Sequence, residues 1–381
     1  MLDIPLVHAD WTFALWSILT LLAAFGFWAD TTKLGQNISG VALIMALAMA
    51  LSNFGVLPMT APAYDVVWSY LVPLAIPLLL LKADLRKVIS ETGDMLAAFF
   101  LGAIGTTIGA LIGYFLLPLG EEAPKLAGVF SATYIGGSMN MAAVTQSVGL
   151  DPSIATASVA ADNVIGVMYL AFLAMVPSMA FFRWWFKISV SEKKSQDSEA
   201  DVTEKPVVHL ELKHMAFVLG LSFAICAAGK AMATYFGVDG YSIMFITAIT
   251  IAVANIFTKQ LKNFQGDYEI GLFLMYIFFA AIGISADVVA MLDKAMVIAV
   301  YAAIIVVCHA VFIFGMSRFF KLNLFEVVIA SNACASGPAS AAALAAGRGR
   351  HDLVAPAILL GVFGYAVANF VGVMLATWLG A

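Results

Sequence analysis

Long apolar runs, separated by short polar stretches, follow one another along the whole chain. A helix needs roughly 20 mostly apolar residues to cross a bilayer. By that rule the pattern predicts twelve segments, at 11–28, 39–57, 65–81, 94–117, 125–148, 153–182, 214–236, 240–258, 268–285, 294–319, 324–347 and 353–379. The connections between most of them are short, which is typical of a compact helical bundle.

One connection is long and rich in charged residues. Residues 187–213 divide the chain into a predicted first transmembrane repeat, 1–186, and a second, 214–381. Lys and Arg prefer the cytoplasmic side of a membrane. We therefore expect a cytoplasmic linker, because four basic residues lie in it or directly before it: Arg183, Lys187, Lys193 and Lys194.

Composition supports the membrane interpretation. Hydrophobic residues make up 62% of the chain and charged residues 11%, and the mean hydropathy is +0.97. A soluble domain has roughly 45–50% apolar and about 25% charged residues. The sequence therefore predicts an all-α, multi-pass protein surrounded by a lipid bilayer. No phosphate-binding loop, zinc-ligand spacing, nucleophile elbow or nucleic-acid-binding patch is evident, so we expect neither an enzyme nor a nucleic-acid-binding protein.

The two halves of the chain resemble each other. A shift of 200 residues places SATYIGGSMNMAA (131–143) over SNACASGPASAAA (331–343), with four of thirteen positions identical. A shift of 203 residues places the Ala-Asp corner at Asp84 over the one at Asp287. Helices rich in small residues match easily by chance, so the common order of elements is the stronger argument. It predicts a duplicated unit, as in many transporters.

Loop charges indicate the relative direction of the two copies. Lys and Arg gather in alternate loops of the first half and in the opposite loops of the second half, which favours inverted repeats. Six crossings in each half would instead make the repeats parallel. We therefore expect 11 to 13 crossings. The segments that could be miscounted or cross only partly are the over-long run 152–187 and the two Gly-containing segments.

Both matching stretches place glycine and polar residues inside an apolar tract. Adjacent glycines weaken a helix, and hydrocarbon offers no water to a loosened backbone. In inverted-repeat carriers, interrupted helices meet near the middle of the membrane, where helix N-termini and free carbonyls bind solutes and ions. The alternative is close helix packing by small residues. The candidate binding residues are Ser131, Thr133, Gly136, Gly137, Ser138, Asn140, Ser331, Asn332, Ser336, Gly337, Pro338 and Ser340.

A carboxylate lies deep in the segment that follows the first of these stretches. Asp162 and Asn163 stand about ten residues into it, in VAADNVIG. A charge at that depth is costly and indicates an ion pathway, and hard cations such as Na⁺ prefer oxygen ligands. Asp162 could alternatively cap a helix or form a structural pair. We expect supporting roles for His309, Tyr365 and Asn369, although His309 could simply bond a backbone carbonyl.

These stretches and the ADLRKV corner resemble the cation:proton antiporter and anion transporter superfamily, and the whole chain is similar to the YjcL-type family of bacterial membrane proteins. The resemblance implies a core domain with two crossing broken helices, a panel domain used for dimerisation, and elevator-like alternating access. It also implies a homodimer in the bacterial cytoplasmic (inner) membrane.

Two branches of the superfamily imply different ion sites. Sodium:proton antiporters carry Asp-Asp or Asn-Asp where this chain has Asp162 and Asn163, but no partner lysine is evident in the last helix. Bile acid:sodium symporters imply sodium at the broken helices instead, but their glutamate before the second break is absent here.

The leading interpretation is a secondary transporter, coupled to Na⁺ or H⁺, that moves a small anionic organic solute. Apart from the coupling ion, we expect no cofactor. A cation:proton antiporter with its ion site at Asp162 and Asn163 is the alternative within transport. A membrane receptor or structural subunit is the alternative outside transport, but it does not account for two matched broken helices.

Overall fold

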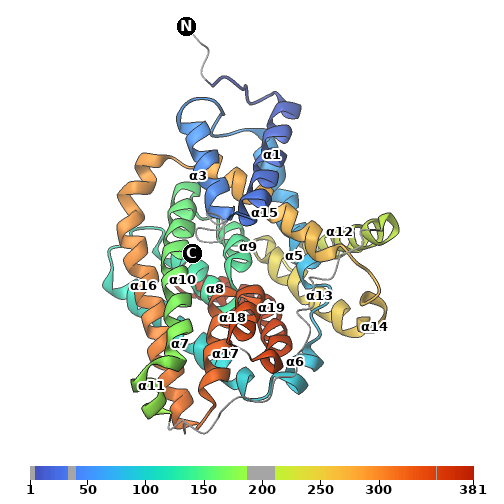
Figure 1. Cartoon of the computed structure of the whole chain (residues 1–381). Coiled ribbons are helices and arrows are strands. Elements are labelled where there is room, and N and C mark those ends of the chain that lie inside the picture. Colours follow the sequence, from blue (N-terminus) through green and yellow to red (C-terminus); the bar gives the residue numbers. More distant parts are fainter. Residues whose placement is uncertain (1–4, 33–39, 187–210, 349) are drawn as a thin grey trace.

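The computed structural model describes residues 5–32, 40–186, 211–348 and 350–381, and every regular element in these ranges is a helix (Figure 1). The predicted linker, 187–213, lies almost wholly outside them. The α-helices are α1 (Thr12–Asp30), α3 (Gly40–Asn53), α4 (Pro62–Val66), α5 (Val72–Leu80), α6 (Leu85–Thr92), α7 (Asp94–Leu116), α8 (Ala123–Gly136), α9 (Ser138–Val148), α10 (Pro152–Met175), α11 (Ala180–Trp185), α12 (Leu212–Tyr235), α13 (Ser242–Ile256), α14 (Thr258–Leu261), α15 (Asp267–Ser285), α16 (Val288–Phe319), α17 (Leu324–Ser336), α18 (Pro338–Gly347) and α19 (Val354–Trp378).

Four short non-α helices connect or interrupt these elements. A π-helical turn joins α4 to α5, and three 3₁₀ turns lie in the connections. They are η1 (Val67–Leu71), η2 (Val176–Ser178), η3 (Asp239–Tyr241) and η4 (His351–Leu353). The over-long predicted run thus divides into α10, η2 and α11.

Within the part of the chain that the structure describes, eight helices are long and apolar enough to cross a membrane. The other four of the twelve predicted segments differ. α3 and α13 have 14 and 15 residues, and the two Gly-containing segments are each split into a pair of shorter helices. At 1.5 Å per residue, 14 residues span only about 21 Å. For the two Gly-containing segments, the difference arises because average apolarity over twenty residues does not register a break.

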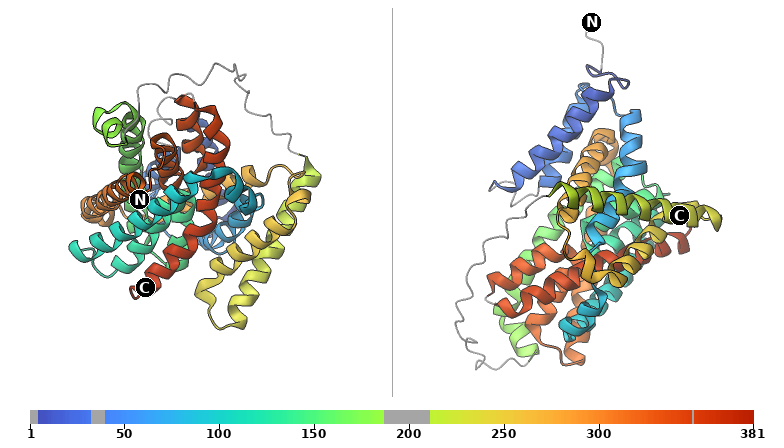
Figure 2. Two further views of the ribbon diagram at one scale, coloured as in Figure 1. Left: turned by 90° about the horizontal axis from the view of Figure 1, so that it is seen from below. Right: turned by 90° about the vertical axis from the view of Figure 1, so that its right-hand side faces the viewer.

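The helices form three groups (Figure 1). α16 packs along both α7 and α10, and α8 packs along α19. α12 and α13 pair on the opposite side, against α5 (Figure 2). α1 and α3 pack together against α15. α19 also packs against α9, α17 and α18, so all four helices of the two broken pairs contact this one helix.

Two asparagines connect the halves reciprocally. Asn255, in α13, donates to the carbonyl before Asp84 (3.0 Å) and accepts from the N–H after it (2.9 Å). Asn53, in α3, makes the same two bonds on either side of Asp287, at 2.9 and 3.2 Å. Each amide thus satisfies the backbone at the Ala-Asp corner of the other half. Matching residues that exchange the same contacts are what a two-fold relation between the halves produces.

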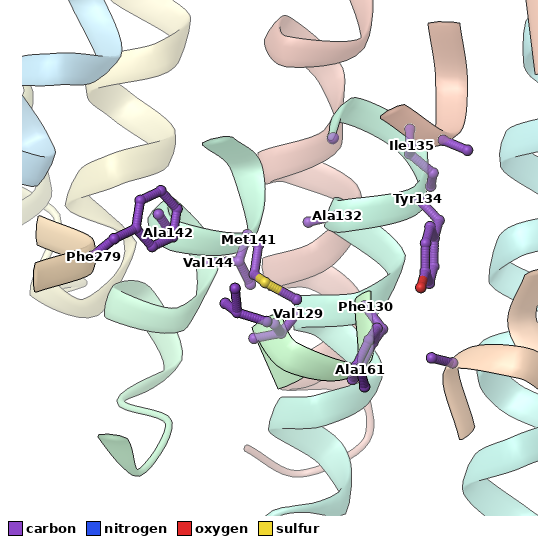
Figure 3. Close-up of a cluster of buried hydrophobic side chains, with 14 of the residues drawn as sticks. Val129, Phe130, Ala132, Tyr134, Ile135, Met141, Ala142, Val144, Ala161 and Phe279 are labelled. Atoms are coloured by element: carbon purple, nitrogen blue, oxygen red, sulfur yellow. The ribbon is translucent and has the colours of Figure 1, made fainter. Parts of the chain in front are cut away.

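Apolar side chains surround the first broken helix. Val129 and Phe130 of α8, Met141 and Val144 of α9, and Phe279 of α15 belong to one buried cluster (Figure 3). Non-helical backbone is tolerated at membrane depth only where protein or a water-filled cavity surrounds it. This cluster provides the protein surroundings for the break.

Candidate functional site

Two glycines interrupt the broken helices. Gly137 separates α8 from α9, with φ 85° and ψ 179°. Gly337 separates α17 from α18, with φ 87° and ψ −172°. This backbone region is essentially restricted to glycine. The two breaks share one conformation and lie 200 residues apart, which is the shift that the sequence comparison used.

The two breaks are in contact with each other. A Cβ placed on Gly137 would lie 3.4 Å from both the carbonyl carbon and the oxygen of Ser336, and 3.5 Å from the nitrogen of Gly337. Pro338 is the first residue of α18, where its missing N–H costs no helical bond. The first N–H groups of a helix have no partner inside it. The starts of α9 and α18 therefore bring unpaired donors to one place.

Asp162 supplies a carboxylate at the first break. Ser138, the first residue of α9, donates from Oγ to Asp162 Oδ2 at 3.2 Å. Tyr134 projects from α8 (Figure 3) and lies beside the same carboxylate. Ser138 is exposed and Asp162 is half-buried. The neighbouring Asn163 uses its amide nitrogen within α10, on the carbonyl four residues earlier (2.9 Å).

Several buried polar atoms around the breaks have no hydrogen-bond partner among the described residues. They are Ser131 Oγ, Tyr134 Oη, Asn140 Oδ1, and both Oδ1 and Nδ2 of Asn332. Leaving such an atom unsatisfied costs about 1–3 kcal/mol. Buried polar groups in native proteins almost always have a partner, so these atoms indicate a bound water, ion or solute.

Asn140 connects this region to the last helix. Its Nδ2 donates to the carbonyl oxygen of Tyr365 (3.0 Å) and to Oδ1 of Asn369 (2.8 Å). The same three residues line a cavity of about 20 Å³, together with side chains of α5 and α15. About 10–15 Å³ is enough for one water molecule. The cavity therefore accommodates a single water molecule or a small ion.

A buried hydrogen-bonded chain holds the second broken helix. His309, in α16, uses both ring nitrogens. Its Nδ1 is 2.9 Å from Thr106 Oγ1 of α7, and its Nε2 is 2.9 Å from Ser331 Oγ of α17. Ser331 Oγ is also 2.6 Å from the hydroxyl of Tyr169 in α10. The chain thus joins four helices through side chains that are all buried.

Comparison with known proteins assigns the family. Residues 17–381 match the family model described as "Protein of unknown function (DUF819)". The chain belongs to this family. It is 32% identical over 390 residues to the uncharacterized membrane protein YjcL of Bacillus subtilis (strain 168), and the alignment covers 98% of each chain. The expected similarity to YjcL-type membrane proteins is confirmed, and this DUF819 chain is a membrane protein with several membrane-spanning helices.

The structure does not bring every candidate residue of this DUF819 chain into the site. Thr133 donates to a carbonyl of its own helix (2.7 Å), and Ser340 donates within the first turn of α18 (3.2 Å). Gly136 remains helical and packs against the backbone of α19. Ser336, by contrast, lies exposed at the second break and belongs to the site. The sequence identifies a residue as small or polar but does not show which way it faces.

Three residues near the site were not among the sequence candidates. Tyr169 follows Asp162 by seven residues, which is two helical turns on the same face, and that spacing could have indicated it. Tyr134 lies inside the first polar stretch. Thr106 is one hydroxyl in an apolar helix, and nothing in the local pattern distinguishes it.

Proposed function

We propose that this protein is a secondary active transporter of the bacterial inner membrane that couples the movement of a small anionic organic solute to Na⁺ or H⁺. The observation that supports this most strongly is the contact between two glycine-broken helices, with Asp162 bonded at one of the breaks. Interrupted helices at an ion and substrate site are typical of transporters.

The coupling cation binds at Asp162. The groups around the carboxylate offer oxygen, from the hydroxyls of Ser138 and Tyr134, and the break frees backbone carbonyls nearby. Oxygen is the ligand that hard cations such as Na⁺ prefer. A carboxylate in a membrane segment can also accept a proton, so one site suits either ion.

The anionic solute binds at the N-termini of α9 and α18. Both helices start at a break, and the residues next to the breaks, Ser138 and Ser336, are exposed. Unpaired N–H groups and the positive end of the helix dipole attract an anion. The unpartnered amide of Asn332 and the hydroxyl of Ser131 supply further hydrogen-bonding groups.

The two halves are inverted repeats, and transport follows an elevator mechanism. The reciprocal bonds of Asn53 and Asn255 support a two-fold relation between the halves. In this proposal α7–α10 and α16–α19 form the moving core. α1, α3, α5, α12, α13 and α15 form the panel that dimerises. With this arrangement, we propose that the family belongs to the cation:proton antiporter and anion transporter superfamily.

One observation favours the alternative of a cation:proton antiporter. The cavity of about 20 Å³ beside Asn140 accommodates an ion or a water molecule, but not an organic solute. An antiporter needs no organic solute at all. The two functions therefore differ in whether an organic anion binds together with the cation.

Thermal unfolding of the purified protein, in Na⁺ against K⁺ at several pH values, tests the proposal. A ligand at 100 times its Kd stabilises the folded state by about 2.7 kcal/mol. We expect Na⁺ to raise the Tm of the wild type and of Asp94→Asn, a control at an exposed acid in the first turn of α7, but not that of Asp162→Asn. No Na⁺ effect on the wild type at any pH would exclude sodium coupling.

A screen of organic anions in Na⁺ and in K⁺ then separates the two functions. An anion that raises the Tm further only in Na⁺, and is taken up by proteoliposomes along a Na⁺ gradient, supports symport. Competition between Na⁺ and protons with no effect of any anion would support the antiporter instead.

A further inference from the structure

Two prolines open the backbone in the stretch formed by η1 and α5. Proline has no N–H, so the carbonyl four residues before it loses its helical donor. Pro73 in this way frees the carbonyl of Ser69, and Pro77 frees the carbonyl of Pro73. At membrane depth such carbonyls need other donors, because lipid supplies none.

Helix α12 supplies both donors. Lys230 donates from Nζ to the carbonyl of Ser69 at 3.0 Å, and Cys226 donates from Sγ to the carbonyl of Pro73 at 3.3 Å. Residues four apart lie on one face of a helix. Lys230 is therefore held toward α5 by one of its three N–H donors.

A cavity of about 170 Å³ opens beside the Lys230 ammonium, between α5 and α12. Its walls are apolar apart from Lys230 and the segment around Ser69, and they include Leu74, Phe223 and Ala227. The ammonium also lies 5.2 Å from the centre of the Tyr70 ring. Among the described residues, no carboxylate forms an ion pair with Lys230.

The cation and the apolar walls follow one another along α12 in the order that a lipid requires. Lys230 lies five residues before the end of α12 at Tyr235, which is about 7.5 Å at 1.5 Å per residue. A position this close to the end of an apolar helix suits contact with lipid headgroups, toward which lysines extend. Phe223 lies seven residues before Lys230, two turns farther into the apolar part of the same face.

We propose that this cavity binds an anionic phospholipid. The phosphate accepts hydrogen bonds from the Lys230 ammonium, and the upper part of one acyl chain lies along Ala227 and Phe223. Basic pockets between membrane helices bind such headgroups in other proteins. The occupant links α12 to α5, and its binding is independent of the transport site at the breaks.

Native mass spectrometry with phosphatidylglycerol against phosphatidylcholine tests the assignment. We expect the wild type to retain phosphatidylglycerol preferentially, and Lys230→Gln to retain it about five-fold less, since one basic residue near the headgroups contributes about that factor. Glutamine keeps an N–H donor on a slightly shorter side chain while it removes the charge. Lys230→Arg and Lys294→Gln, a lysine at the start of the α16 span, should behave as the wild type.

Three results would overturn the proposal. They are equal retention of both lipids by the wild type, unchanged retention in Lys230→Gln, and complete displacement of the lipid by millimolar inorganic phosphate, which would assign the site to a free anion. If Lys230→Gln does not fold, Ala227→Phe decides. It fills the cavity and leaves the cation in place, so unchanged phosphatidylglycerol retention in that variant would contradict the proposal.

Discussion

Replacing Gly137 by alanine should strain the first break without causing a steric clash. The new Cβ would lie no closer than 3.4 Å to its nearest neighbours at the second break, which is ordinary contact. The cost is therefore conformational, because φ 85° with ψ 179° is strongly unfavourable for residues with a Cβ. Holding alanine there costs about 1–3 kcal/mol.

Thermal unfolding measures this cost. With an unfolding entropy of about 2.1 cal/mol/K per residue over 381 residues, a loss of 1–3 kcal/mol lowers the Tm by about 1–4 °C. Relief of the strain would move Ser138 away from Asp162, so stabilisation by Na⁺ should also weaken.

Gly220 provides the matched control. It lies in α12, and nothing lies within 4 Å of a Cβ placed on it. Gly220→Ala should leave the Tm unchanged or raise it slightly, because alanine favours a helix over glycine by about 1 kcal/mol. If Gly137→Ala matched Gly220→Ala in Tm and kept the full Na⁺ response, the reasoning about the break would be refuted.

Two further predictions concern polar residues away from the break glycines. Asn53→Ala and Asn255→Ala each remove two hydrogen bonds to an Ala-Asp corner. We expect each to lower the free energy of unfolding by about 1–3 kcal/mol, and the two losses to add in the double variant. Clearly unequal losses in thermal unfolding would argue against a two-fold relation between the halves. Asn332→Leu removes two unpartnered buried atoms. It should raise the free energy of unfolding of the ligand-free protein by about 1–3 kcal/mol and weaken solute binding. A lower Tm without ligand would mean that these atoms have partners.

The breaks could be predicted from the sequence because their chemistry is local. A Gly-Gly pair and a Gly-Pro pair inside apolar runs leave few alternatives to an interrupted helix, whatever the rest of the fold. The lone carboxylate of Asp162 is informative for the same reason, since few structures can accommodate a charge in that position.

Contacts between distant helices could not be predicted in the same way. Thr133 and Ser331 have similar hydroxyls and occur in matching stretches, but Thr133 bonds within its own helix and Ser331 bonds His309 and Tyr169. Which of these occurs depends on helix rotation, and tertiary packing sets that rotation. Likewise, Lys230 in α12 donates to a carbonyl that lacks a helical donor because of a proline more than 150 residues earlier in the chain.

Equilibrium binding of ²²Na⁺ to the purified protein tests the central claim most directly. We expect saturable binding to the wild type that protons reduce, because both ions compete for one carboxylate, and unchanged binding to Asp94→Asn. Ser138→Ala should bind more weakly, since it loses the hydroxyl next to Asp162. The account predicts no saturable binding to Asp162→Asn, and binding to that variant equal to that of the wild type would contradict it.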